Sequence, residues 1–156
     1  MNIFLPYEYD IKKSVISLDD RRLIKQILEV HQLARIKIEN RSGGYSNHPI
    51  YQHYKNHLDF MIEYGLQACR EYKHRFNKEH SLYSSFVEMF FNHDTQRFLY
   101  YVPFYAEGSK KLPNCIRTSE NVGQLYRDKL VNKWKSDKLK PTWTNREIPE
   151  FYKEYV

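Results

Sequence analysis

Two long segments of this chain carry apolar residues at helical spacing, and they limit the folds that it can adopt. In residues 18–38, apolar side chains recur three or four positions apart, so we expect one helix there. They are Leu23, Ile27, Val30 and Ala34, and the cap candidates are Ser17, Asp19 and Asp20. Residues 50–76 carry a longer apolar stripe and predict a long helix. Its members are Tyr54, Leu58, Met61, Gly65, Cys69, Tyr72 and Phe76. Because glycine weakens a helix, Gly65 predicts the close approach of another helix.

The rest of the chain predicts two further helices and two irregular regions. The third helix covers residues 81–93, and its inward side chains are Leu82, Phe86, Met89 and Phe90. The fourth is capped by Thr118 or Ser119 and carries Val122, Leu125, Tyr126 and Leu130. We expect residues 94–117 to be irregular, with at most a short strand or helix, and the aromatic tail 140–156 to wrap the surface.

These patterns favour a mainly α fold. The sequence shows no alternation of strands with helices, no glycine-rich phosphate loop and no C-x-x-C motif. A chain of 156 residues suits one domain. We therefore expect residues 1–156 to form a compact single-domain helical bundle with long irregular loops and an aromatic C-terminal tail.

The basic charge of the chain favours an anionic partner such as nucleic acid or an acidic membrane. The net charge is +6 and aromatic residues make up 16% of the chain, which suits contact with phosphates and bases. No apolar run is long enough for a transmembrane helix, and residues 1–6 lack the features of a signal peptide. Cys69 and Cys115 are too few for a disulfide framework. We expect an intracellular protein without membrane contact.

Glu29 lies on the flank of the first predicted helix, beside cationic and polar residues. Arg22, Lys25 and Gln26 precede it by seven, four and three positions, so they share its side of the helix. A carboxylate surrounded by cations in this way is held ionised unless burial opposes them. The competing interpretation is a surface glutamate paired with Lys25, worth only ~0.3–0.5 kcal/mol.

The histidines around the second predicted helix raise the question of a metal. His53 and His57 are four positions apart, and His48 precedes His53 by five, a set that zinc could use. No cysteine pair accompanies them, so we assign no metal. His48 is better interpreted as capping the backbone or contacting a phosphate. The basic run 133–140, which includes Trp134, suits either a solvated face or a DNA-facing surface.

Four motifs together resemble the pyrimidine-dimer DNA glycosylases, the family of phage endonuclease V, and in particular a bacterial and phage branch of it. They are Phe4-Leu5-Pro6-Tyr7, Leu18-Asp19-x-x-Arg22-Leu23-x-Lys25-Gln26-x-x-Glu29, Asn47-His48-Pro49 and Pro141-Thr142-Trp143. The resemblance spans most of the chain and is weakest over residues 77–115. It implies a bundle of mainly three helices with the N-terminus between them, near the acid.

The resemblance also implies a reaction. In this family the N-terminal amine attacks C1′ of a deoxyribose and forms a Schiff base, and a glutamate on the first helix assists the following β-elimination. The motifs place that glutamate at Glu29 and the amine at Met1. An α-amine has a pKa of ~7.7–8.0, so part of it is neutral and nucleophilic near neutral pH. Base flipping accompanies binding, and Tyr7 and Trp143 are candidates for filling the gap.

The expected site therefore has two parts, and Arg22 is expected to orient Glu29. Met1, Glu29 and Arg22 are the expected catalytic residues. The expected DNA-binding residues are Asn2, Arg21, Lys25, Gln26, His48, Arg117 and Trp143. The partner is double-stranded DNA, no cofactor is required, and a monomer is expected.

The chain also departs from the family. Asn2 is bulkier than the family's second residue, so Met1 is expected to be retained, and Leu28 and Gln32 stand where the family has basic residues. A lesion other than a pyrimidine dimer, or a modified base, stays open as the substrate. So do excision without strand cleavage, a non-catalytic DNA-binding or regulatory protein, and a metal-dependent hydrolase.

Overall fold

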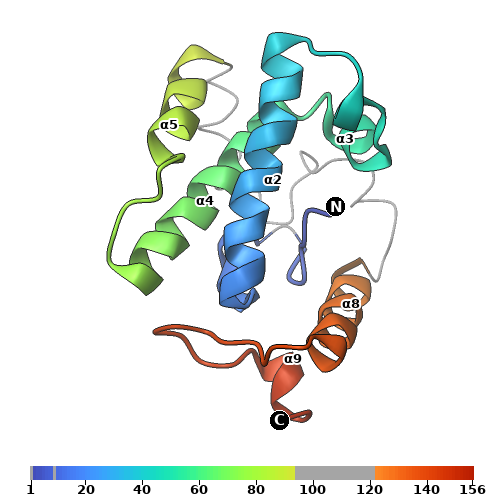
Figure 1. Cartoon of the computed structure of the whole chain (residues 1–156), viewed down its shortest axis with the longest axis vertical. Coiled ribbons are helices and arrows are strands. Elements are labelled where there is room, and N and C mark those ends of the chain that lie inside the picture. Colours follow the sequence, from blue (N-terminus) through green and yellow to red (C-terminus); the bar gives the residue numbers. More distant parts are fainter. Residues whose placement is uncertain (1, 9, 94–121) are drawn as a thin grey trace.

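The computed structural model describes residues 2–8, 10–93 and 122–156, and the regular structure of these ranges is entirely helical (Figure 1). The α-helices are α1 (Ile11–Ser17), α2 (Asp20–Glu39), α3 (Pro49–Tyr54), α4 (Leu58–Phe76), α5 (Tyr83–Asn92), α8 (Val122–Ser136) and α9 (Glu150–Lys153), and η1 (Gly44–Asn47) is a 3-10 helix. Within these ranges there is no strand. The predicted mainly α fold is confirmed.

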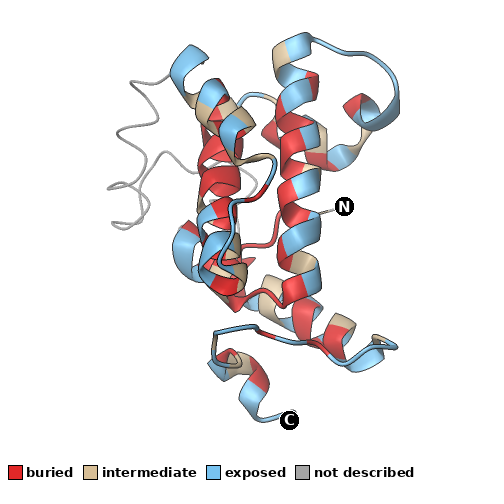
Figure 2. Ribbon diagram, turned by 60° about the vertical axis from the view of Figure 1, so that its left-hand side comes forward, coloured by how far each residue is buried: buried red, intermediate tan, exposed pale blue. Residues whose placement is uncertain are grey.

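The core lies between the two longest helices, α2 and α4. Leu23, Ile27 and Val30 of α2 are fully buried, as are Phe60 and Met61 of α4. Figure 2 shows buried residues along the facing sides of these helices and exposed residues on their outer sides. The helical spacing of apolar residues thus predicted the buried sides of both helices.

Helix α5 packs closely on α4 at Gly65, as the glycine in the apolar stripe predicted. A Cβ atom at Gly65 would lie 2.2 Å from Cε1 of Phe86, whose ring is fully buried. Only a residue without a side chain allows this approach. Phe86 and Met89 are buried as predicted, whereas Leu82 and Phe90 are only partly buried.

The predicted helix over residues 50–76 is interrupted. Helix α3 ends at Tyr54 and α4 begins at Leu58, so the expectation of one continuous helix was wrong. The break lets the ring of Tyr54 stack on that of Phe60, with ring centres 5.2 Å apart and planes at 11°. In an unbroken helix these two residues would lie on well-separated sides, because six positions correspond to about 600° of rotation.

The other boundaries differ in smaller ways. Residues 11–17 form α1, which the sequence did not predict, and the side chain of Asp10 caps it by accepting from the backbone N–H of Lys13. In α8, Val122 and Leu130 are buried as predicted, but Leu125 is 60% exposed and does not face inward. The cap candidates Thr118 and Ser119, and the region 94–117, lie outside the described residues.

The C-terminal tail packs against the start of α2. The indole Nε1 of Trp143 donates to the carbonyl of Ser17 (2.9 Å), and Thr142 and Thr144 donate to the carboxylate of Asp20. Trp134 of α8 donates to Asp19 (2.7 Å). The tail therefore wraps this end of the bundle, as expected, and brings α8 beside α2.

Candidate active site

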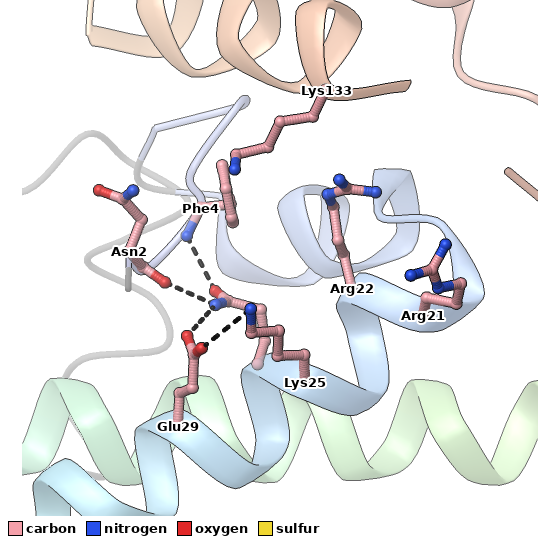
Figure 3. A pocket seen from close by; sticks show the side chains of 8 residues that line it. Asn2, Phe4, Arg21, Arg22, Lys25, Glu29 and Lys133 are labelled. Atoms are coloured by element: carbon pink, nitrogen blue, oxygen red, sulfur yellow. Dashed lines mark hydrogen bonds and ion pairs between the residues drawn. The ribbon is translucent and has the colours of Figure 1, made fainter. Parts of the chain in front are cut away.

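A pocket of about 170 Å³ lies where α2, α8 and the N-terminal segment (residues 2–8) meet. The residues that line it are Asn2, Phe4, Arg21, Arg22, Lys25, Gln26, Glu29 and Lys133. Figure 3 shows their side chains, with Lys133 reaching in from α8 opposite the α2 residues. The structure thus brings together six of the residues that the sequence singled out, and adds Phe4 and Lys133 to them.

Glu29 provides the carboxylate of this pocket. It stands on α2 with a side chain that is 15% exposed, and Nζ of Lys25 lies 3.7 Å from its Oε1. The amide Nε2 of Gln26 is 3.4 Å from Oε2 (Figure 3). The predicted pair with Lys25 is therefore present, but Glu29 is largely shielded from solvent and faces a cavity, unlike an ordinary surface glutamate.

Gln26 ties the N-terminal segment to Glu29. Its Nε2 donates to the carbonyl of Asn2 (2.5 Å), and its Oε1 accepts from the backbone N–H of Phe4 (2.9 Å). The residue is only 2% exposed. The amide is therefore occupied inside the protein, where it holds the backbone of Asn2 and Phe4, and the DNA contact by Gln26 stays a prediction.

Tyr64 of α4 completes this buried hydrogen-bonded group. Its hydroxyl lies 2.9 Å from both the carbonyl oxygen of Phe4 and Oε1 of Gln26. Complete burial raises the pKa of Tyr64 well above its usual value, so the hydroxyl keeps its proton and donates it. The backbone of Asn2 and Phe4 is therefore held from α2 and α4 at once.

Arg22 does not orient Glu29 as the sequence suggested. Its Nη1 and Nη2 atoms donate to the two carboxylate oxygens of Asp137, at 2.7 and 3.1 Å, and Nη1 is 3.4 Å from Asp19. This hydrogen bonding lowers the pKa of the Asp137 carboxyl and keeps it ionised. Arg22 lines the pocket, but its guanidinium group is hydrogen-bonded to Asp137 and Asp19 and not to Glu29.

The four other predicted residues have different outcomes. His48 caps α3, since its Nδ1 accepts from the backbone N–H of Ile50 (3.1 Å), and it does not line the pocket. This confirms the capping alternative. Trp143 is 9% exposed and packs edge-on against Trp134 at 5.0 Å, so it cannot fill a gap in DNA without leaving the core. Met1 and Arg117 lie outside the described residues.

Two residues of the pocket were not predicted as site residues. Lys133 appeared in the sequence only as part of a basic run, and nothing local shows that α8 returns to α2. Phe4 appeared only as part of a motif. The sequence holds a signal for each of them. Lys133 and Trp134 are adjacent, and Lys133 faces the pocket while Trp134 faces the core. Phe4 belongs to the apolar N-terminal motif.

The histidines do not form a metal site. Across the part of the chain that the structure describes, no group of three His, Cys, Asp or Glu side chains could hold a metal ion. His53 is exposed on α3, and His57 lies in the interruption, directly before α4. No described helix is both long and apolar enough to cross a membrane.

The family model of the pyrimidine dimer DNA glycosylases matches residues 1–84. This is more than half of the 156 residues, and the chain belongs to this family. The match includes Asn2, Gln26 and Glu29, whereas Lys133 and Asp137 lie beyond it. Neither the curated proteins nor the solved structures that were compared contain a match to the chain. Membership implies a DNA glycosylase that binds DNA.

Proposed function

We propose that this protein removes a damaged or modified base from duplex DNA and then cleaves the strand, using its N-terminal amine as the nucleophile and Glu29 as the acid and base. The observation that carries the proposal is the hydrogen-bonded link from Asn2 through Gln26 to Glu29. It holds the second residue of the chain beside a shielded carboxylate at the pocket.

Covalent geometry supports the role of the amine. The first residue is bonded to Asn2, so its nitrogen lies no more than about 5 Å from the Asn2 Cα. Asn2 and Glu29 line the same pocket, which supports an attack by the amine on a sugar bound there. An α-amine with a pKa of ~7.7–8.0 needs no further activation to react near neutral pH.

The proposed chemistry proceeds in two stages. The neutral amine attacks C1′, the bond from C1′ to the base breaks, and the base leaves with the bonding electrons and takes up a proton. Glu29 takes the proton that the amine loses after its attack and gives it to O4′, so the ring opens, the Schiff base forms and Glu29 is left ionised. Ionised Glu29 removes a proton from C2′, and the C3′–O bond breaks to release the 3′ phosphate. Water hydrolyses the imine and restores the amine.

The cations of the pocket suit a DNA backbone. Arg21, Lys25 and Lys133 reach this site from two helices. Phosphates neutralised by such side chains release counterions, so binding is expected to weaken steeply with salt. We further infer that residues 1–156 work as one domain, because hydrogen bonds from α8 and the tail to Asp19 and Asp20 join the C-terminal part to α2. Such a role would place the protein inside the cell, with the DNA.

Borohydride trapping tests the proposal. The protein is incubated with duplexes carrying pyrimidine dimers, modified bases or an abasic site, and borohydride reduces any Schiff base to a stable adduct. We expect an adduct that mass spectrometry locates at the first residue and not at Lys133. A tag fused before Met1 should abolish it, and Glu29→Gln should lower turnover by about 10²–10⁴-fold while DNA binding persists.

Two results would contradict the proposal. One is full strand cleavage by the tagged protein, because the amine would then be unnecessary. The other is DNA binding without excision or adduct on every duplex, which would favour the non-catalytic DNA-binding alternative. The intact mass of the untagged protein, which shows whether its first residue is Met1, is the necessary control.

A further inference from the structure

Two large apolar side chains stand on the outer side of α2, next to the proposed active site. Ile24 is 37% exposed and Leu28 is 52% exposed. They are four positions apart, so they form one continuous patch along the helix, which we term the apolar ridge. Exposed positions of a helix are usually polar, and this patch needs an explanation.

The surroundings of the apolar ridge point to DNA. Leu28 directly precedes Glu29 in sequence and follows Lys25 by three positions, which brings their Cβ atoms to about 5–6 Å. Ile24 follows Arg21 by three positions in the same way. Arg21, Lys25 and Glu29 all line the pocket. The ridge is therefore flanked along one edge by the cations of the proposed site.

This combination fits the duplex better than it fits a protein. A phosphate backbone is attracted by the flanking cations, while the interior of the duplex is apolar and accepts an aliphatic wedge between base steps. Leu28 lies on the same outer side of α2 as Lys25, whose side chain is exposed and lines the pocket. An apolar side chain in this place can occupy the space that a nucleotide vacates when it leaves the stack.

We propose that the apolar ridge, and Leu28 foremost, wedges into the base stack at the target step and stabilises the flipped-out state. The inference rests on the proposed function and adds to it the group that opens the duplex. Leu28 is a positioning residue here, since it acts on the neighbouring bases and not on the reacting atoms.

The test uses base unstacking, which does not depend on turnover. All variants carry Glu29→Gln, so that no DNA is cut. The probe is a duplex with a tetrahydrofuran abasic analogue opposite 2-aminopurine, whose fluorescence rises when it leaves the stack. We expect Leu28→Ala to lower the unstacked fraction by roughly tenfold, because it removes most of the inserted apolar surface.

Matched variants separate the wedge from a general surface effect. Gln32→Ala changes another exposed position of α2, one turn beyond Leu28, and Leu125→Ala removes an exposed leucine from α8; both should leave the fluorescence unchanged. Leu28→Lys should raise affinity for undamaged duplex through its charge and still lose unstacking. Leu28→Met should retain unstacking, because methionine keeps a large apolar side chain at this position. Leu28, Gln32 and Leu125 are exposed, so folding is expected to persist, as circular dichroism would check.

The outcomes are distinct. Normal unstacking by both Leu28→Ala and Leu28→Lys overturns the wedge, even if the enzyme forms its adduct as proposed. Loss of unstacking with an adduct confined to the first residue supports both proposals. If no adduct forms with any duplex, the proposed chemistry fails, and the fluorescence result still decides whether Leu28 opens DNA. Normal unstacking together with concentration-dependent self-association that Leu28→Ala abolishes would overturn the wedge by assigning the ridge to a protein interface.

Discussion

The guanidinium of Arg22 binds both carboxylate oxygens of Asp137, at 2.7 and 3.1 Å, across 115 residues of sequence. Arg22 lines the pocket from α2, and Asp137 follows the end of α8. Asp137 lies outside the residues that match the family, so this ion pair joins the matched part of the chain to α8.

Replacing Asp137 should therefore affect the pocket more than the stability. Asp137→Asn removes the anionic partner, and we expect the free energy of unfolding to fall by about 1–2 kcal/mol because both side chains are only partly buried. The freed Arg22 should adopt several orientations, which weakens DNA binding. Urea unfolding and DNA titration would measure the two effects. Lys153→Gln, which breaks an ion pair in the tail, is the control and should change neither by a measurable amount.

The amide of Gln26 is the group whose loss should separate the N-terminal segment from Glu29. Gln26→Leu leaves the carbonyl of Asn2 and the N–H of Phe4 without their partners. We expect a destabilisation of about 2–4 kcal/mol and loss of the borohydride adduct. The matched control is Tyr64→Phe, which removes one hydroxyl from the same group and keeps Gln26 in place. It should cost about 1–2 kcal/mol and leave adduct formation intact; equal loss of adduct in both variants would show that stability alone governs it.

Lys133 should contribute to DNA affinity through its charge. Lys133→Gln is expected to weaken binding to any duplex sequence and to reduce the slope of log K against log salt by about 0.9, the amount expected for one phosphate contact. Lys37→Gln, at an exposed position near the other end of α2, removes the same charge away from the pocket. Titrations at several salt concentrations would compare them, and equal slopes for the two variants would argue against a phosphate contact by Lys133.

The sequence predicted the local parts of this site and missed the long-range ones. Helical spacing is enough to place Lys25, Gln26 and Glu29 on one flank of α2, because those relations repeat every turn. The partner of Arg22 could not be found this way, since Asp137 meets it only through the return of α8. The sequence also could not predict which groups the Gln26 side chain binds, because a polar residue on the flank of a helix can face either water or a buried backbone.

The same distinction explains the errors in the fold. The apolar stripe of residues 50–76 continues through the interruption before Leu58, so periodicity alone could not detect the break that stacks Tyr54 on Phe60. Trp143 in an aromatic tail suits base stacking as well as burial. Its contact with Trp134 and its hydrogen bond to Ser17 bury Trp143 in the fold, and both interactions depend on the tertiary structure.

Acidic pH should weaken the packing of α5 on α2 through His31. Burial lowers the pKa of His31 from its usual 6.5, and the charges of Arg35 and His80 act in the same direction. The unfolded chain therefore takes up a proton near pH 6.5 while the folded protein resists it. The free energy of unfolding should be fully retained above that pH and should fall as the pH drops through the lower folded value.

The contact at stake is the hydrogen bond between Nε2 of His31 and Oγ of Ser85 (2.8 Å). Urea unfolding of His31→Gln should show a shallower loss of stability below pH 6.5 than the unchanged protein. A residual slope is expected, because burial also lowers the pKa of His80. The control is His53→Gln at an exposed position of α3. An identical slope for His31→Gln and the unchanged protein would show that His31 does not contribute.

Gly65 should be intolerant of even one added carbon. Alanine favours a helix over glycine by about 1 kcal/mol, but a Cβ atom at this position would lie 2.2 Å from Cε1 of Phe86. Overpacking a buried contact costs about 1–3 kcal/mol, so we expect Gly65→Ala to lower the free energy of unfolding despite the gain in propensity. Phe86→Leu alone should also destabilise, by leaving a cavity. In the double variant the new methyl group fills part of that cavity, so its total loss should be smaller than the sum of the two single losses. Strict additivity in urea unfolding would mean that α4 and α5 relieve the contact by moving apart, and not by repacking at Phe86.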